Sequence, residues 1–157
     1  MPEKRTTNAG LKVNIFNGRK GFSFKKSKAA ELVQKTSRKF GLRKALINIE
    51  IADDKRIVEV NKKFLKSGKI TDVISFDVSE DDDKIFDIIV NAQLARRQAK
   101  LRGHSFEAEL MLYIIHGLLH QLGFDDLTTR KAAKMHRMED EILGKSGFGI
   151  VYGSCKR

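Results

Sequence analysis

The chain has 157 residues, about the size of one ordinary domain, and its 41% apolar content and ten Phe residues exclude a disordered chain. A single cysteine excludes an internal disulfide framework and any zinc module built on several cysteines. The longest apolar run, Leu110 to Ile115, has six residues, too few for a membrane span, and residues 1–25 lack the apolar segment of a secretory signal. We therefore expect a soluble, cytoplasmic protein that does not enter a membrane.

The formal net charge of +11 lies in the first third of the chain. Residues 1–46 carry thirteen Lys and Arg against two acidic residues, whereas residues 47–157 carry eighteen of each sign. Such asymmetry favours a polyanionic partner, of which nucleic acid is the commonest in the cytoplasm, although a merely solubilising surface is the alternative. We expect Lys25, Lys26 and Lys28 to guide such a polyanion electrostatically.

Apolar residues alternate with polar ones at 11–15 and 46–51, as in half-buried strands, and recur at helical spacing in several longer segments. The expected elements, in chain order, are a strand at 11–15, a helix at 23–41, a strand at 46–51, a helix from 53 or 54 through 64, a strand at 73–78, a turn at 80–83, a strand at 85–90, and helices at 91–103, 105–122 and 128–143. In the helix from 53 or 54, the side chains of Ile57, Val60 and Phe64 are expected to share one apolar stripe.

Helices and strands are mixed without strict alternation, and no Gly/Ser-rich linker or repeat divides the chain. The expected fold class is therefore α+β (mixed α/β), with one small mixed sheet in a single domain. We expect residues 1–10 to be a flexible N-terminus, residues 11–143 to form the domain, and residues 144–157 to be an irregular tail.

The helix at 105–122 is apolar around nearly its whole circumference, so it is expected to be buried, yet it carries His116 and His120. A spacing of four places both imidazoles on one helical face, which suits two ligands of one tetrahedral metal. Gly123 can end the helix in a left-handed turn, and Asp126 stands where sites of the H-x-x-x-H-x-x-G-x-x-ligand type take their third ligand. Three protein ligands leave a fourth position for water, the layout of a catalytic zinc site.

Two alternatives stand beside this interpretation. A single histidine on an apolar helix is more often a buried, hydrogen-bonded core residue than a metal ligand. Asp125 could be the ligand instead of Asp126, or could orient a ligand histidine by accepting its N–H. The position that carries the general base of H-E-x-x-H peptidases is Gly117 here, which argues against a metallopeptidase.

The histidine block resembles the signature H-G-x-L-H-x-x-G-Y-D-H of the YbeY family of endoribonucleases. Two further blocks in the same order are similar to that family: one with Asn61 and Phe64 followed by the segment 71–76 (TDVISF), and the segment 87–91 (DIIVN). The histidine block matches at His116, Gly117, Leu119, His120, Gly123 and Asp125, with Phe124 for Tyr and Asp126 for the last His.

The resemblance implies a zinc-dependent endoribonuclease of the single-strand type that acts in 16S rRNA 3′-end maturation and small-subunit quality control. It implies a four-stranded mixed sheet flanked by about five helices, a metal in a groove, and ribosomal RNA of the small subunit as partner. By position, the ligands of one Zn²⁺ per chain are His116, His120 and Asp126. The alternative is a ribosome-assembly RNA-binding factor whose metal is structural.

This chain departs from the family pattern at two functional positions. A carboxylate at Asp126 lowers the formal charge of the metal centre by one compared with imidazole, which predicts a more alkaline activity optimum. The family's basic residue after the aromatic one is Leu65 here, so Lys66 and Lys69 become the candidates for phosphate binding, without the bidentate fork of arginine.

The expected catalytic group is a metal-bound water, and the sequence identifies no general acid. Asp72 and Ser75 are candidates only because they lie in a matched block. Their alternative role is to cap or close the strand at 73–78.

Overall fold

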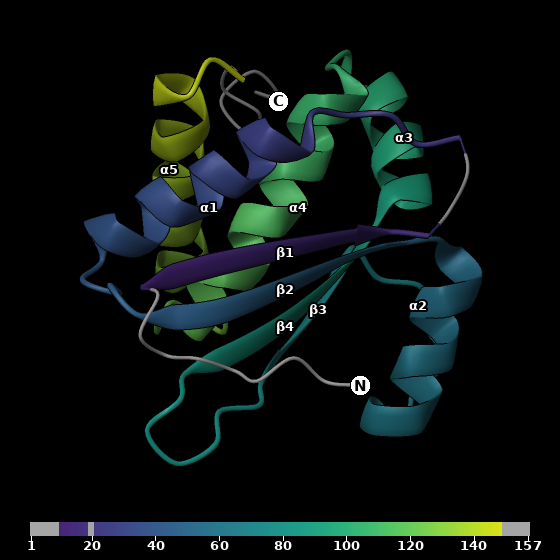
Figure 1. The fold of residues 1–157 in the computed structure, drawn as a ribbon. Coiled ribbons are helices and arrows are strands. Elements are labelled where there is room, and N and C mark those ends of the chain that lie inside the picture. Colours follow the sequence, from purple (N-terminus) through teal and green to yellow (C-terminus); the bar gives the residue numbers. More distant parts are fainter. Residues whose placement is uncertain (1–9, 19–20, 149–157) are drawn as a thin grey trace.

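A computed structural model describes residues 10–18 and 21–148, which form one mixed four-stranded sheet with helices on both faces (Figure 1). The strands lie in the order β1-β2-β4-β3, where β1–β2 and β2–β4 are parallel and β3–β4 is an antiparallel pair. Their bounds are β1 (Leu11–Asn17), β2 (Ala45–Ala52), β3 (Val73–Asp77) and β4 (Ile85–Asn91). Strands β1 and β3 are therefore the two edges of the sheet.

Four helices contribute to one core on the first face of the sheet, and a fifth packs on the second face (Figure 1). The first group is α1 (Lys26–Lys39), α3 (Ala92–Arg102), α4 (Phe106–Gln121) and α5 (Thr129–Lys145). On the second face lies α2 (Asp54–Val60), which continues into a π-helical turn, η2 (Asn61–Leu65). The single domain, the four-stranded mixed sheet and the five helices confirm the expected α+β class.

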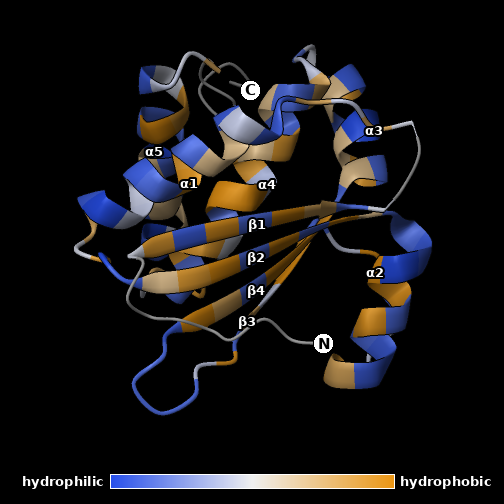
Figure 2. Ribbon diagram, viewed as in Figure 1, coloured by the Kyte–Doolittle hydropathy of each residue, from blue (hydrophilic) through white to orange (hydrophobic). Residues whose placement is uncertain are grey.

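Alternation along the strands divides the apolar side chains between two cores. In β4, Phe86, Ile88 and Val90 face the larger core, while Ile89 joins Ile74 of β3 beneath α2. Helix α4 is buried around most of its circumference, and Figure 2 shows its largely hydrophobic ribbon among the other helices on this face of the sheet, with hydrophilic stretches on the outer helices. Side chains at the end of α4 can therefore reach solvent only where the helix leaves this core.

Three side chains cap helices at the positions that the sequence indicates. Asn91 accepts a hydrogen bond from the Leu94 N–H, and Ser105 accepts one from the Ala108 N–H. Asp53, rather than Asp54, caps α2. These caps satisfy amide groups that a helix leaves without intrahelical partners, which fixes where each helix begins.

Three expectations differ from the structure, of which the first is that α1 begins at Lys26, three residues after the expected start. Ile57 and Val60 are buried, but Phe64 is 58% exposed, because the wider π-helical turn changes the angular spacing and rotates Phe64 off the apolar stripe. Helix α5 continues to Lys145, two residues past the expected end. The flexible segment expected at 1–10 lies outside the described residues up to residue 9, and so does the tail from residue 149.

Candidate metal centre and its cleft

Helix α4 approaches the sheet closely at Gly117, between the two histidines. A methyl group at this position would lie 2.8 Å from Val73 Cγ2 and 2.9 Å from Ile88 Cγ2, closer than carbon atoms pack. The glycine therefore lets α4 lie directly on β3 and β4. This close packing leaves no room for the glutamate that a metallopeptidase carries at the same position.

The turn that ends α4 brings a carboxylate back toward both histidines. Gly123 adopts a left-handed conformation (φ +103°), and the Phe124 N–H donates to the Leu119 carbonyl at 3.0 Å. Asp126 Oδ2 then lies 3.6 Å from His116 Nε2, and Asp126 Oδ1 lies 3.9 Å from His120 Nε2. The two Nε2 atoms are 3.0 Å apart.

These three side chains could hold one metal ion. Their ligand atoms all lie within 4.8 Å of one another. Ligand atoms placed tetrahedrally around zinc at its usual bond lengths are about 3.3 Å apart, so small rotamer adjustments bring all three into range. Two imidazoles and one carboxylate are also a donor set that zinc accepts in catalytic sites.

A buried carboxylate that the sequence interpretation missed orients the first histidine. Glu139 of α5 is fully buried; its Oε2 lies 3.0 Å from His116 Nδ1, and its Oε1 lies 3.0 Å from His136 Nδ1. Because a carboxylate only accepts hydrogen bonds, His116 carries its proton on Nδ1 and leaves the Nε2 lone pair for a metal. Glu139 lies on the apolar face of α5 between Met135 and Ile142. A charged residue on an apolar helix face is the feature of the sequence that could have identified it.

Burial and nearby negative charges have opposite effects on the pKa of His116. Burial lowers the pKa, but the hydrogen bond to Glu139 and the negative charges of Glu139, Asp72 and Asp126 outweigh burial and hold the pKa above its usual value. The pocket is therefore electronegative, as expected of a site that attracts a cation.

Asp125, the alternative ligand, stabilises the turn instead. Its Oδ1 accepts the Leu127 N–H at 3.1 Å, and its Oδ2 pairs with Lys131 Nζ at 3.3 Å. The Leu127 N–H, with a further contribution from Lys131, lowers the pKa of Asp125. Among the described residues, it is Asp126 that completes the group with the two histidines.

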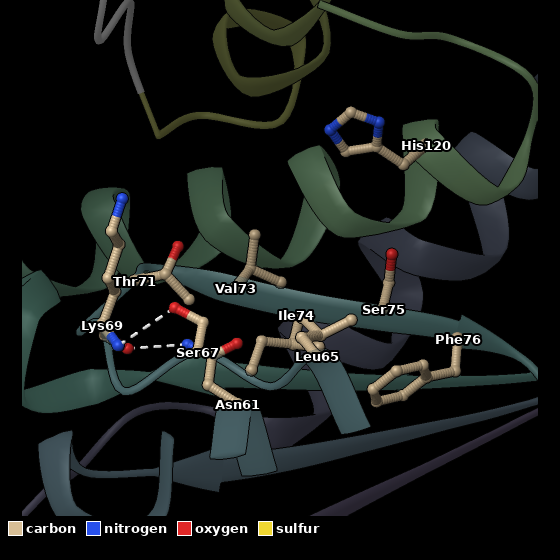
Figure 3. Close-up of a pocket in the computed structure, with 10 residues that line it drawn as sticks. All are labelled: Asn61, Leu65, Ser67, Lys69, Thr71, Val73, Ile74, Ser75, Phe76 and His120. Carbon is tan, nitrogen blue, oxygen red and sulfur yellow. Dashed lines mark hydrogen bonds between the residues drawn. The ribbon is translucent and has the colours of Figure 1, made fainter. Parts of the chain in front are cut away.

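A cleft of about 480 Å³ runs along the edge strand β3 and reaches His120 (Figure 3). Val73 and Ser75 point from β3 toward α4, whereas Phe76 lies on the other side of the strand (Figure 3). The lining residues are Asn61, Leu65, Ser67, Lys69, Thr71, Val73, Ile74, Ser75, Phe76 and His120. The cleft thus borders the candidate metal centre on one side and apolar side chains on the other.

Comparison with known proteins assigns the family. The sequence model of the family described as Endoribonuclease YbeY matches residues 14–147, which include the whole candidate metal centre. The chain belongs to the YbeY family of endoribonucleases. Like the other members, it is an enzyme that cleaves phosphodiester bonds of RNA.

Curated relatives and a solved structure agree with this assignment. The chain is 36% identical over 113 residues to Endoribonuclease YbeY of Staphylococcus saprophyticus, covering 66% of this chain and 74% of the relative. It is also 36% identical over 120 residues to the Staphylococcus aureus (strain MSSA476) protein, covering 69% and 76%. The solution structure of TM1509 from Thermotoga maritima has a similar fold, with a TM-score of 0.58 and 25% identity over 85% of this chain and 90% of that one.

The two catalytic candidates beside the YbeY histidine block have different surroundings. Asp72 Oδ1 accepts the Val73 N–H at 2.8 Å and the Thr71 hydroxyl at 3.2 Å, so this carboxylate closes the start of β3. Ser75 lines the cleft, and its Oγ accepts a hydrogen bond from Gln121 Nε2 at 2.9 Å. Because Gln121 occupies an acceptor site of Ser75, the Ser75 hydroxyl proton can be donated into the cleft.

The position at which the YbeY resemblance implies a basic residue is the apolar Leu65. Leu65 is 53% exposed and lines the cleft, while Lys69 lines the same cleft. Lys66 follows η2 in a left-handed conformation (φ 52°) and is not among the lining residues. Of the two predicted phosphate partners, Lys69 is therefore the better placed.

The lysines at the start of α1 lie far from the metal centre. The Lys25 N–H is 3.4 Å from Glu107 Oε2, in the first turn of α4. Nine residues of helix separate Glu107 from His116, which is about 14 Å along the helix axis. Lys25 therefore lies near the end of α4 that is opposite the candidate metal centre, and Lys26 and Lys28 follow it in the first turn of α1.

Among the described residues, no helix is long and apolar enough to cross a membrane.

Proposed function

We propose that this enzyme holds one zinc ion with His116, His120 and Asp126 and cleaves single-stranded RNA in the maturation of the 16S rRNA 3′ end. Its partners would be ribosomal RNA and the small ribosomal subunit, in the cytoplasm, where it would also act in small-subunit quality control. The observation that carries the proposal is the placement of the three candidate ligands at the edge of an open cleft.

The exposure of the ligands favours a catalytic metal over a structural one. His120 and Asp126 have side chains that are 30% and 39% exposed, and His120 lines the cleft. Structural zinc sites are enclosed by four protein ligands, whereas the only candidate group in the described residues has three. An assembly factor with a structural metal would need a fourth ligand and a buried ion.

Three side chains have a role beside the metal ligands in this proposal. When bound, the metal supplies a Lewis acid for a phosphoryl oxygen and lowers the pKa of water. Lys69 binds the phosphate backbone as a point charge, and the Ser75 hydroxyl donates a hydrogen bond to a phosphate oxygen. Glu139 holds the His116 ring in one tautomer and one orientation, so the ligand set is arranged before RNA arrives.

The test compares cleavage of a precursor RNA that spans the 3′ end of 16S rRNA by wild type and His116→Ala, each metal-loaded and metal-free. His104→Ala, at the opposite end of α4, is the matched histidine control. We expect cleavage by wild type and His104→Ala with metal, and a loss of at least 100-fold in His116→Ala. Equal cleavage by all proteins would indicate a contaminating nuclease and favour the assembly-factor hypothesis.

The same proteins distinguish the two roles of the metal. Removal of a catalytic zinc abolishes cleavage and leaves the fold, whereas removal of a structural zinc unfolds the domain. Circular dichroism of the metal-free wild type therefore decides between them. The substrate is tested in the same series with the cleavage segment annealed to a complementary strand, where a single-strand enzyme loses activity.

A further inference from the structure

An apolar patch lies beside the cleft, on the α2 side of β3. Three of the seven exposed large apolar side chains in the described part of the chain fall within seven residues: Phe64 (58% exposed), Leu65 (53%) and Ile70 (52%). The half-buried Phe76 of β3 supports them, since its ring centroid lies 5.4 Å from that of Phe64. Phe64 contacts Phe76, and Phe76 lines the cleft together with Leu65, so we call Phe64, Leu65 and Phe76 the aromatic patch.

The segment that carries Phe64 and Leu65 is positively charged. The exposed lysines of this segment are Lys62, Lys63, Lys66 and Lys69, and residues 61–71 contain no Asp or Glu. Lys63 Nζ lies 5.3 Å from the centre of the Phe64 ring. An apolar surface on a segment with four exposed lysines suits a partner that is itself anionic and carries flat apolar groups.

The patch and the candidate metal centre share the cleft. Leu65 and Phe76 line it together with His120, although Phe76 and Ser75 lie on opposite sides of β3 (Figure 3). An RNA strand with a phosphate at His120 can therefore cross the edge of β3 and place a neighbouring base against the patch. Single-stranded RNA exposes its bases for such stacking, whereas duplex RNA does not.

We propose that the aromatic patch is a nucleobase-binding subsite, where one base of single-stranded RNA stacks on Phe64 while the lysines of the same segment hold the adjacent phosphates. This inference rests on the proposed function, because it assigns the single-stranded substrate to the same cleft. Stacking on an aromatic face tolerates every base, so the subsite selects for unpaired RNA more than for sequence.

The test measures binding without cleavage, by fluorescence anisotropy of a labelled single-stranded RNA of about ten nucleotides with metal-free protein. Phe64→Ala is expected to weaken binding about fivefold or more, which corresponds to about 1 kcal/mol. Phe64→Tyr keeps the aromatic face and should bind like wild type. Phe16→Ala is the matched control, since Phe16 is 55% exposed on β1, the opposite edge strand.

A second RNA of the same length, with the bases removed from its central sugars, separates stacking from charge. Wild type should bind it more weakly than the complete RNA, and the difference between wild type and Phe64→Ala should disappear. The proposal is overturned if Phe64→Ala binds the complete RNA as tightly as Phe16→Ala, or if it weakens binding to both RNAs equally. In either case the cleavage test of His116→Ala still stands, whereas a wild type that binds no single-stranded RNA overturns the subsite and the proposed function together.

Discussion

The replacement Glu139→Gln tests whether the buried carboxylate prepares the candidate metal centre. Glu139 accepts hydrogen bonds from the Nδ1 atoms of His116 and His136, each at 3.0 Å. Glutamine has the same shape, but its amide group has one accepting oxygen and one donating nitrogen. One of the two histidines must therefore change its tautomer or lose its partner.

The magnitude follows from which histidine loses its partner. If His116 rotates or takes the other tautomer, its Nε2 no longer faces His120 and Asp126 with a free lone pair, and metal affinity falls about 10- to 100-fold, or about 1.4 to 2.7 kcal/mol. A buried N–H without an acceptor also costs the metal-free protein about 1 to 3 kcal/mol. We therefore expect weaker metal binding together with a melting temperature lower by several degrees.

The assay is competition for zinc against a chromophoric chelator, accompanied by thermal unfolding of metal-free protein. Glu141→Gln is the matched control, because Glu141 lies two residues away on the same helix and pairs only with exposed lysines, Lys39 and Lys145, in the described structure. Zinc affinity in Glu139→Gln equal to that in Glu141→Gln would refute the orienting role. A lower melting temperature with unchanged zinc affinity would assign Glu139 to packing alone.

Three further predictions address the helix, the third ligand and the basic third of the chain. Gly117→Ala gains about 1 kcal/mol of helix propensity, but the added methyl group overlaps Val73 and Ile88 at a cost of about 1 to 3 kcal/mol. Denaturant unfolding should therefore show a free energy of unfolding lower by up to about 2 kcal/mol. A stabilised variant would contradict the close packing. Asp126→His raises the formal charge of the metal centre by one, so the acidic limb of the rate–pH profile should move to lower pH; an unchanged profile would refute this. Neutralising Lys25, Lys26 and Lys28 together should lower RNA affinity and leave cleavage per bound RNA unchanged. The slope of log affinity against log salt concentration should become shallower by about 0.7 for each phosphate that these lysines no longer neutralise. Affinity equal to wild type at every salt concentration would exclude these lysines from binding.

The candidate ligands could be predicted from the sequence because local helix geometry determines their arrangement. A spacing of four residues puts His116 and His120 on one face whatever surrounds the helix, and Gly123 supplies the turn that returns Asp126. The apolar circumference of α4 likewise predicts its burial. These features depend on interactions within about ten residues of chain.

Glu139 could not be placed from the sequence because its role depends on how α5 packs against α4. It is 23 residues from His116, and its spacing identifies only a charge on an apolar helix face. Phe64 was wrongly placed for a different reason. A π-helical turn contains more residues than an α-helical turn, so the side chains after it face a different direction. Nothing in the sequence of residues 53–64 indicates where the helix changes from one type to the other.

The departure at Leu65 and the aromatic patch have one physical consequence. A leucine at the basic position of the YbeY pattern removes a guanidinium from the cleft, and the same leucine extends the exposed apolar surface next to Phe64. Lys69 remains in the cleft as a point charge, without the two parallel hydrogen bonds that arginine can offer a phosphate. If the aromatic patch binds a base as proposed, stacking holds the strand in register without a guanidinium on the phosphate, because it fixes a nucleotide relative to β3 and hence relative to His120. Recognition in this cleft should therefore depend more on unpaired bases, and less on salt, than in relatives that keep the basic residue.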